Sequence, residues 1–146
     1  MTEITFGMIK SDLIMARQAI SYFEETHFKD VKNQAAYHIQ QAAEKLIKIQ
    51  IYANAKNVDN RSMYTHSLDR LIRYAETENI PMIIPKYVSD KRSMLTDWEA
   101  GSRYDLNFSV KISSLTRAYQ EISDWYDALN PMRKPRRKVM PTGSRL

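Results

Sequence analysis

The 146-residue sequence contains no cysteine, only three glycines and only five prolines. Without cysteine, the chain can form no disulfide bond and has no thiolate chemistry or cysteine-ligated metal site. The scarcity of glycine and proline argues against a hairpin-rich β protein and favours helices. No apolar run approaches the length that a bilayer requires, and no secretory signal is recognisable. We therefore expect a cytoplasmic protein that does not associate with a membrane.

The net charge of +5 is concentrated at one end of the chain. The segment 131–146 holds six of the 22 Lys and Arg residues and no acid, so residues 1–130 carry 16 basic against 17 acidic side chains. We therefore divide the chain into a nearly neutral domain, 1–130, and a basic tail, 131–146, that we expect to be disordered when free. The tail could contact RNA in a salt-sensitive way or be a solvated extension. Its candidate nucleic-acid-binding residues are Arg133, Lys134, Arg136, Arg137 and Lys138.

Hydrophobic spacing predicts an all-α bundle of about five helices. Apolar residues recur at helical intervals in five segments, which short polar or proline-containing connectors separate. The connectors are expected at 56–61 and at 79–85. The predicted helices are 8–25, 30–55 with Asp30 as the N-cap, one that begins at Thr65 or Ser67, 85–101, and 108–129.

The segment 35–53 is the most informative part of the chain, because it reads as one helix with two contrasting faces. One face is apolar, and the other carries His38, Gln40, Gln41, Glu44, Lys45 and Lys48 with Tyr37, Ile51 and Tyr52 among them. Aromatic rings that stack on a base and lysines that contact phosphate can together bind a nucleotide. The same face can equally pack against another helix or a second subunit, with the lysines at its edge.

Four short motifs occur in order along the chain. They are Lys10-Ser11-Asp12-Leu13, AYHIQQAAEKLIK from Ala36 to Lys48, His66-Ser67-Leu68 followed by Leu71, and Arg103-Tyr104-Asp105. In order and spacing the chain resembles the HEPN family (higher eukaryotes and prokaryotes nucleotide-binding domain) over about residues 8–128. The resemblance implies an up-and-down antiparallel helical bundle that is often a homodimer. It also implies a small nucleotidyltransferase as a partner, in a toxin–antitoxin or defence module.

Some branches of that superfamily are metal-independent ribonucleases with an Arg-x4–6-His motif in a late helix. No histidine follows Arg103 at that distance, whereas Arg61 and His66 have the spacing but precede the third predicted helix. His66 could act as a general base while Arg61 or Arg103 stabilises charge on a phosphate. Alternatively, His66 is a structural residue at a helix start, and Arg103 forms an ion pair within the bundle, for example with Glu44.

These observations favour a non-catalytic protein that binds nucleotide or RNA and partners a nucleotidyltransferase. The candidate ligand-binding residues are Tyr37, Gln41, Glu44, Lys45, Lys48 and Arg103. One alternative is a metal-independent endoribonuclease that uses His66 with Arg61 or Arg103. Another is a purely structural dimerisation or assembly module. We expect no metal and no cofactor, because the three histidines are scattered and no metal-ligand spacing occurs.

Overall fold

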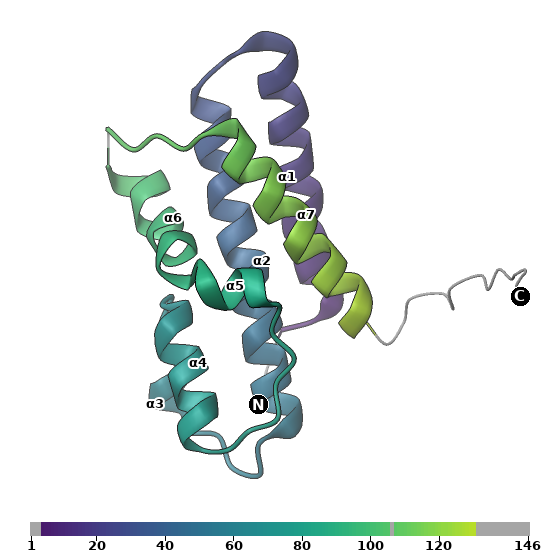
Figure 1. Cartoon of the computed structure of the whole chain (residues 1–146), viewed down its shortest axis with the longest axis vertical. Helices are drawn as coiled ribbons and strands as arrows, with labels where there is room; N and C mark the ends of the chain where they lie inside the picture. The colour runs from purple at the N-terminus through teal and green to yellow at the C-terminus, as the bar shows by residue number, and fades with distance from the viewer. Residues whose placement is uncertain (1–3, 106, 131–146) are drawn as a thin grey trace, which may run out of the picture.

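The computed structural model describes residues 4–105 and 107–130, and it confirms the all-α prediction (Figure 1). The predicted basic tail, 131–146, lies outside the described residues. Within them the chain forms seven helices and no strand. The helices are α1 (Phe6–Thr26), α2 (Asp30–Asn54), α3 (Asn60–Met63), α4 (Leu68–Thr77), α5 (Lys86–Asp90), α6 (Arg92–Tyr104) and α7 (Ile112–Leu129).

Helix α2 is the centre of the bundle. It packs against α1, α4, α6 and α7, which surround it on most sides. Figure 1 shows α1 antiparallel to α2, with α7 beside α1 on one side of α2 and α6 on the other side. The short α5 contacts both α6 and α7 and so links the two sides. No helix in the described part of the chain is long and apolar enough to cross a membrane.

Capping groups explain where α1 begins and why the chain turns back after it. The Thr5 hydroxyl accepts a hydrogen bond from the Met8 amide at 3.2 Å, which satisfies one of the free amides of the first turn. At the other end His27 adopts a left-handed conformation (φ 59°), and its amide donates to the Phe23 carbonyl. Asp30, predicted as the N-cap of the next helix, is instead the first residue of α2. Its carboxylate still lies where the helix dipole favours negative charge.

An additional one-turn helix, α3, begins within the segment 56–61 that was predicted as a polar connector and ends at Met63. Asp59 is its N-cap, and the Asp59 carboxylate accepts hydrogen bonds from the Arg61 amide at 3.1 Å and the Ser62 hydroxyl at 2.8 Å. A single turn of four residues is too short to show hydrophobic periodicity, so the sequence pattern could not reveal it.

The helix predicted over 85–101 is two helices, α5 and α6, separated at Lys91, and α6 continues past Gly101 to Tyr104. Phe108 was predicted to begin the last helix, but α7 starts at Ile112. The Phe108 ring instead lies on Gly101, where an added Cβ would be 2.5 Å from ring carbon Cδ1. Gly101 therefore allows the loop after α6 to approach that helix closely.

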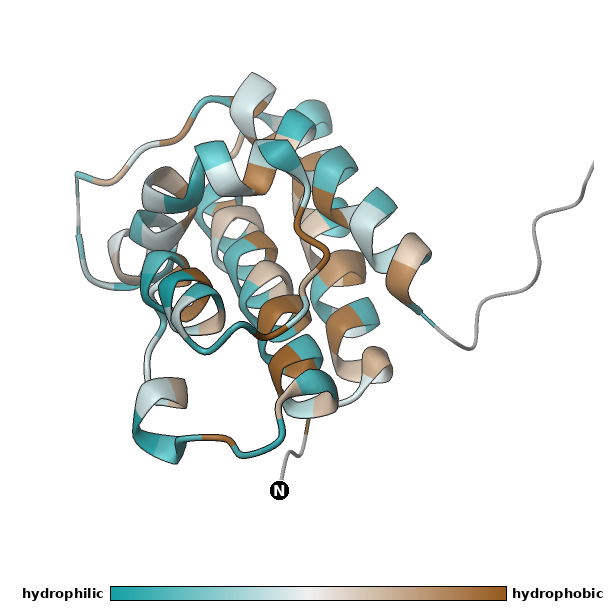
Figure 2. Ribbon diagram, turned by 60° about the horizontal axis from the view of Figure 1, so that its bottom comes forward, coloured by the Kyte–Doolittle hydropathy of each residue, from teal (hydrophilic) through white to brown (hydrophobic). Residues whose placement is uncertain are grey.

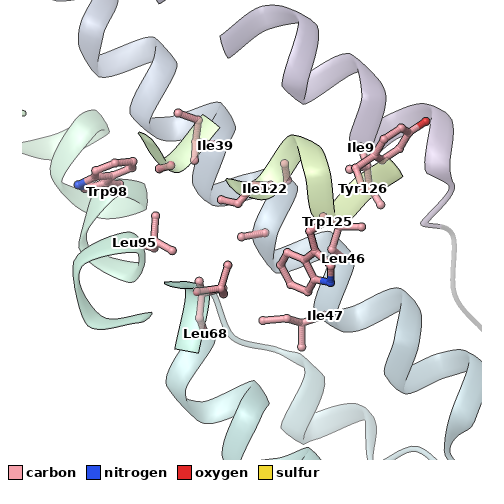
Figure 3. Packing of buried hydrophobic residues seen from close by; sticks show 14 of the residues in the cluster. Ile9, Ile39, Leu46, Ile47, Leu68, Leu95, Trp98, Ile122, Trp125 and Tyr126 are labelled. Carbon is pink, nitrogen blue, oxygen red and sulfur yellow. The ribbon is translucent and has the colours of Figure 1, made fainter. Parts of the chain in front are cut away.

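The hydrophobic core lies between α2 and its neighbours, as Figure 3 shows. Ile39, Leu46 and Ile47 of α2 are fully buried, as are Leu68 of α4 and Ile122 of α7. Each such side chain contributes roughly 1.5–3 kcal/mol through burial of its apolar surface. The core accounts for the predicted apolar face of α2.

The polar face of α2 is also largely covered. Ile51 and Gln40 are fully buried, and Glu44 is only 5% exposed. Since a buried polar group is costly unless it is hydrogen-bonded, the partners of Gln40 and Glu44 define the most constrained polar region of the protein.

The connector between α4 and α5 is fixed to the core by its backbone. Gln50 of α2 accepts a hydrogen bond from the Ile83 amide at 2.7 Å and donates one to the Ile83 carbonyl at 3.0 Å. The Trp125 indole of α7 donates to the same carbonyl at 2.8 Å. Figure 2 shows hydrophobic residues along this connector as well as on the inward sides of the helices. The apolar connector predicted at 79–85 is thus a packed segment.

Candidate functional site

Glu44 lies at the centre of a polar network that joins α2 to the α3–α4 segment. Its Oε1 accepts a hydrogen bond from Gln40 Nε2 at 3.2 Å and lies 3.0 Å from His66 Nδ1. Its Oε2 accepts one from Lys48 Nζ at 2.9 Å. A buried carboxylate without partners is strongly unfavourable, and these three contacts compensate for the loss of water.

His66 is held from both its backbone and its ring. Its carbonyl accepts a hydrogen bond from Gln40 Nε2 at 2.9 Å. The next residue, Ser67, caps α4 by accepting a hydrogen bond from the Arg70 amide at 3.2 Å. With Nδ1 on Glu44 and Nε2 4.0 Å from Glu99 Oε2, the ring is fixed by two carboxylates while 58% of the side chain stays exposed. The geometry gives His66 a defined orientation toward solvent.

Glu99 and Arg103 extend the network along α6. Glu99 is 6% exposed, and its Oε2 lies 2.6 Å from Arg103 Nη1, one helical turn away. The guanidinium lies 5.7 Å from the ring centroid of Tyr37 on α2 and 4.8 Å from that of Tyr104, whose hydroxyl it also contacts. Arg103 thus forms an ion pair within the bundle, as one of the two alternatives held, but its partner is Glu99 and not Glu44. Arg103 and His66 are joined through the shared Glu99 carboxylate.

Lys45 turns away from this region toward α1. Its Nζ donates to Asp12 Oδ2 at 2.8 Å, and the other oxygen of Asp12 lies 2.8 Å from His38 Nδ1. Gln41 connects the two parts of the network, because it accepts from Lys45 at 3.3 Å and donates to Gln40 at 2.8 Å. Residues of the predicted polar face of α2 thus contact two different neighbours, α1 and the segment between α3 and α4.

The charges of the network are matched one to one. Its three carboxylates are Asp12, Glu44 and Glu99, and each contacts a different cation, Lys45, Lys48 or Arg103, at 2.6–2.9 Å. A phosphate that approached Lys45 or Lys48 would compete with a mostly buried carboxylate. Arg103 differs, because it is 43% exposed and its guanidinium has five N–H donors, so donors remain for a ligand.

A groove of about 840 Å³ opens beside this network. His66, Glu99 and Tyr104 line it, together with Phe108 from the loop after α6. Its volume lies within the range of small-molecule binding sites. The exposed edge of the network therefore faces a space that can hold a ligand of nucleotide size.

His66 lines the groove, but none of the predicted ligand-binding residues does; these are Tyr37, Gln41, Glu44, Lys45, Lys48 and Arg103. Arg61 is exposed on α3, and its side chain has no hydrogen bond or ion pair within residues 4–105 and 107–130. Tyr52 packs against the hydrophobic core. The candidate residues of the basic tail lie outside the described residues. No group of acidic and histidine side chains suited to holding a metal ion occurs in the part of the chain that is described.

Sequence reasoning did not place Asp12 or Glu99 in the candidate site. Glu99 precedes Arg103 by four residues, a spacing typical of an intrahelical ion pair, but the predicted helix ended at Gly101 and so did not include Arg103. Asp12 was noted only as part of a motif. Its contact with Lys45 joins residues 33 positions apart, so no local pattern predicts it.

The chain belongs to the HEPN domain family, whose model matches residues 13–134. Glu44, His66, Glu99 and Arg103 all lie within the matched region. No curated protein and no solved structure matches the chain. Membership of the family implies a function related to nucleotides or RNA.

Proposed function

We propose that this chain is a non-catalytic HEPN module that binds nucleotide or RNA in the groove beside His66. The observation that carries the proposal is the contact of Arg103 with the rings of Tyr37 and Tyr104, of which Tyr104 lines that groove. Tyr104 is 69% exposed, so a base can stack on its ring. The free donors of Arg103 can then bind a phosphate or the edge of a base.

The charge distribution supports binding without catalysis. Metal-independent RNA cleavage requires donors that are arranged in advance around the negative charge of the transition state. Beside His66 the nearest groups are instead the carboxylates of Glu44 and Glu99, and the Arg103 guanidinium is held by Glu99. The negative charge of a transition state at His66 would therefore develop beside two carboxylates, whereas the phosphate of a bound ligand can lie on the exposed side of Arg103.

Binding is tested by fluorescence anisotropy with a short labelled single-stranded RNA and, separately, with ATP as competitor. Arg103→Ala and Tyr104→Ala should each weaken binding about tenfold or more, as loss of a stacking platform does. Arg117→Ala is the matched control, since Arg117 also lies over a tyrosine ring, at 4.9 Å, and pairs with a glutamate one turn away. No binding by the parent chain, or equal losses in all three variants, would contradict the proposal.

The His66–Glu44 contact favours a second candidate, a metal-independent endoribonuclease. A carboxylate that orients an exposed imidazole is the arrangement of a general base and its supporting group. Cleavage of RNA in EDTA by the parent chain, lost in folded His66→Ala and Arg103→Ala variants, would establish this activity. That result would replace the non-catalytic proposal.

We further propose a homodimer that partners a small nucleotidyltransferase in a toxin–antitoxin or defence module. Membership of the HEPN family supports this part of the proposal. A gene for such an enzyme beside the gene for this chain, and co-purification of the two products, is the expected result. Sedimentation of the purified chain as a monomer at all concentrations would exclude the homodimer.

A further inference from the structure

A second groove lies between α1 and α7, on the side of α2 opposite to α6 (Figure 1). It has a volume of about 510 Å³. Two basic side chains and three tyrosine rings are among the residues that line it: Lys10, Arg17 and Tyr22 from α1, and Tyr119 and Tyr126 from α7. None of these residues belongs to the network around Glu44.

Neither Lys10 nor Arg17, the two cations of this groove, forms an ion pair with any residue in the described ranges. Lys10 Nζ lies 5.8 Å from the ring centroid of Tyr126. The two cations are seven residues apart, which places them on one side of α1 and roughly 10 Å apart along its axis. Both are therefore available to an anionic ligand that lies along the groove.

The tyrosines follow the same spacing. Tyr119 and Tyr126 are also seven residues apart, on the side of α7 that faces α1. Because Lys10, near the start of α1, lies over Tyr126, near the end of α7, the two helices run antiparallel and Arg17 lies toward Tyr119. Tyr22 is 50% exposed, and its ring makes an edge-to-face contact with Phe28 at 6.5 Å between centroids. Cations and aromatic rings thus lie side by side along the groove.

Two carboxylates limit where an anion can lie. Glu25 lines the groove at the end of α1, and Asp127 follows Tyr126 on α7. Burial, together with the Asp127 charge, raises the pKa of the Tyr126 phenol, so this ring is uncharged at neutral pH. The middle of the groove, between Lys10 and Arg17, is therefore its most favourable part for a phosphate backbone.

We propose that the α1–α7 groove is a second binding site, for single-stranded RNA, in which Lys10 and Arg17 contact phosphates and Tyr22 stacks on a base. This inference rests on the RNA-related function proposed above. Single-stranded binding sites combine backbone contacts from cations with stacking on aromatic side chains, and the groove supplies both. The sequence gives separate support, because the segment that follows α7, 131–146, holds six basic residues and no acid. A basic segment therefore follows directly on the helix that forms one side of the groove.

The test measures the salt dependence of RNA binding by the full chain. A labelled single-stranded RNA is titrated with the parent, with the double variant Lys10→Ala/Arg17→Ala, and with the control Lys56→Ala/Arg70→Ala. The control removes the same charge from exposed positions that do not line the groove. Loss of two phosphate contacts should lower the slope of log K against log salt by about 1.4, at ~0.7 per contact. The control should keep the parent slope.

A second pair of variants tests stacking. Tyr22→Ala should weaken binding about tenfold, as expected for one stacked base. Tyr64→Ala should have no effect, because Tyr64 is 90% exposed and lies outside the groove. If Tyr22→Ala instead converts a dimer to a monomer and leaves RNA affinity unchanged, the groove is a protein interface and the proposal is wrong.

The results also separate this proposal from the preceding one. If Arg103→Ala weakens RNA binding but Lys10→Ala/Arg17→Ala does not, the α1–α7 site is excluded and the site beside His66 stands. If only the α1–α7 variants weaken binding, the second site stands and the first is excluded. If a chain that ends at Asn130 loses all binding while the groove variants of the full chain keep it, segment 131–146 is the site and the groove proposal is overturned.

Discussion

The two sides of this bundle hold cations in opposite electrostatic settings. In the network around Glu44, the cations Lys45, Lys48 and Arg103 each contact their own largely buried carboxylate at 2.6–2.9 Å. Between α1 and α7, Lys10 and Arg17 have no such partner in the described part of the chain. The comparison shows that lysines in a motif typical of the family can serve mainly to hold the bundle together. Lys10 and Arg17, which have no carboxylate partner among the described residues, are more available to a ligand.

The largest effect on stability is expected from Glu44→Ala. The change leaves Lys48, whose side chain is 15% exposed, and the buried Gln40 without their carboxylate. Removal of one partner of a buried ion pair is strongly destabilising, so urea denaturation should show a loss of about 3 kcal/mol. Glu121→Ala is the control, because its partner Arg117 is 63% exposed, and it should cost less than about 0.5 kcal/mol. Similar losses in the two variants would show that the network contributes no more than a surface pair.

Gly101→Ala tests the wall of the groove beside His66. The new Cβ would lie 2.5 Å from Phe108 Cδ1, so the ring and its loop must move. We expect a loss of about 1–2 kcal/mol in the free energy of unfolding, after the intrinsic preference of helices for alanine has offset part of the strain. At Gly7 of α1 an added Cβ meets only Thr5 Oγ1, at 3.6 Å. Gly7→Ala should therefore be neutral or slightly stabilising, and a loss as large as that at Gly101 would contradict this account.

Tyr126→Phe tests the α1–α7 side through its pH dependence. Burial raises the pKa of this phenol above its ordinary value of 10.0, so the folded state favours the neutral ring. The resulting stability is fully present below pH 10.0 and is lost as the pH rises through the folded pKa. Urea midpoints should thus fall less for Tyr126→Phe than for the parent on passing to alkaline pH. Tyr64→Phe, at a position that is 90% exposed, should follow the parent.

The smallest effect on stability is expected from the double variant Lys10→Ala/Arg17→Ala. Surface substitutions that break no ion pair change the free energy of unfolding by about 0.5 kcal/mol or less. Thermal denaturation of the variant should therefore match that of the parent, even where RNA binding is altered. A loss above about 1 kcal/mol would mean that these cations support the fold, and the contrast between the two grooves would disappear.

The main helices could be predicted from the sequence because their apolar spacing is regular and local. The start of α4 is one example, since Ser67 directly precedes the apolar residues Leu68, Leu71 and Ile72. The separation of α5 from α6 at Lys91 was not predictable, because both pieces bury residues at intervals that also fit one continuous helix. Periodicity reports which side of a segment is buried but not small changes in its direction.

The candidate site was predictable only in part, because its residues come from distant positions. The sequence indicated a polar face on α2, and the structure places Tyr37, Glu44 and Lys48 there. It could not indicate that Glu44 is buried, since a charged residue opposite an apolar stripe ordinarily faces water. Because α2 lies at the centre of the bundle, neighbouring helices also cover its polar face and bury Glu44. The contact of Glu44 with His66, 22 residues away, depends on the path of the α3–α4 segment and has no local signal.

The hydrogen bonds to the Ile83 backbone affect how the connector between α4 and α5 opens to solvent. Ile83 is 62% exposed, yet its amide and its carbonyl are both hydrogen-bonded to Gln50, and the carbonyl also accepts a hydrogen bond from Trp125. This backbone can be exposed to water only after its hydrogen bonds to Gln50 of α2 and Trp125 of α7 have broken. The Ile83 amide should therefore exchange its proton with solvent as slowly as amides inside the helices, and a protease that recognises exposed isoleucine should not cut here in the native protein. The connector between α4 and α5, although it has no secondary structure, should then exchange its amide protons together with the most stable helices of the bundle.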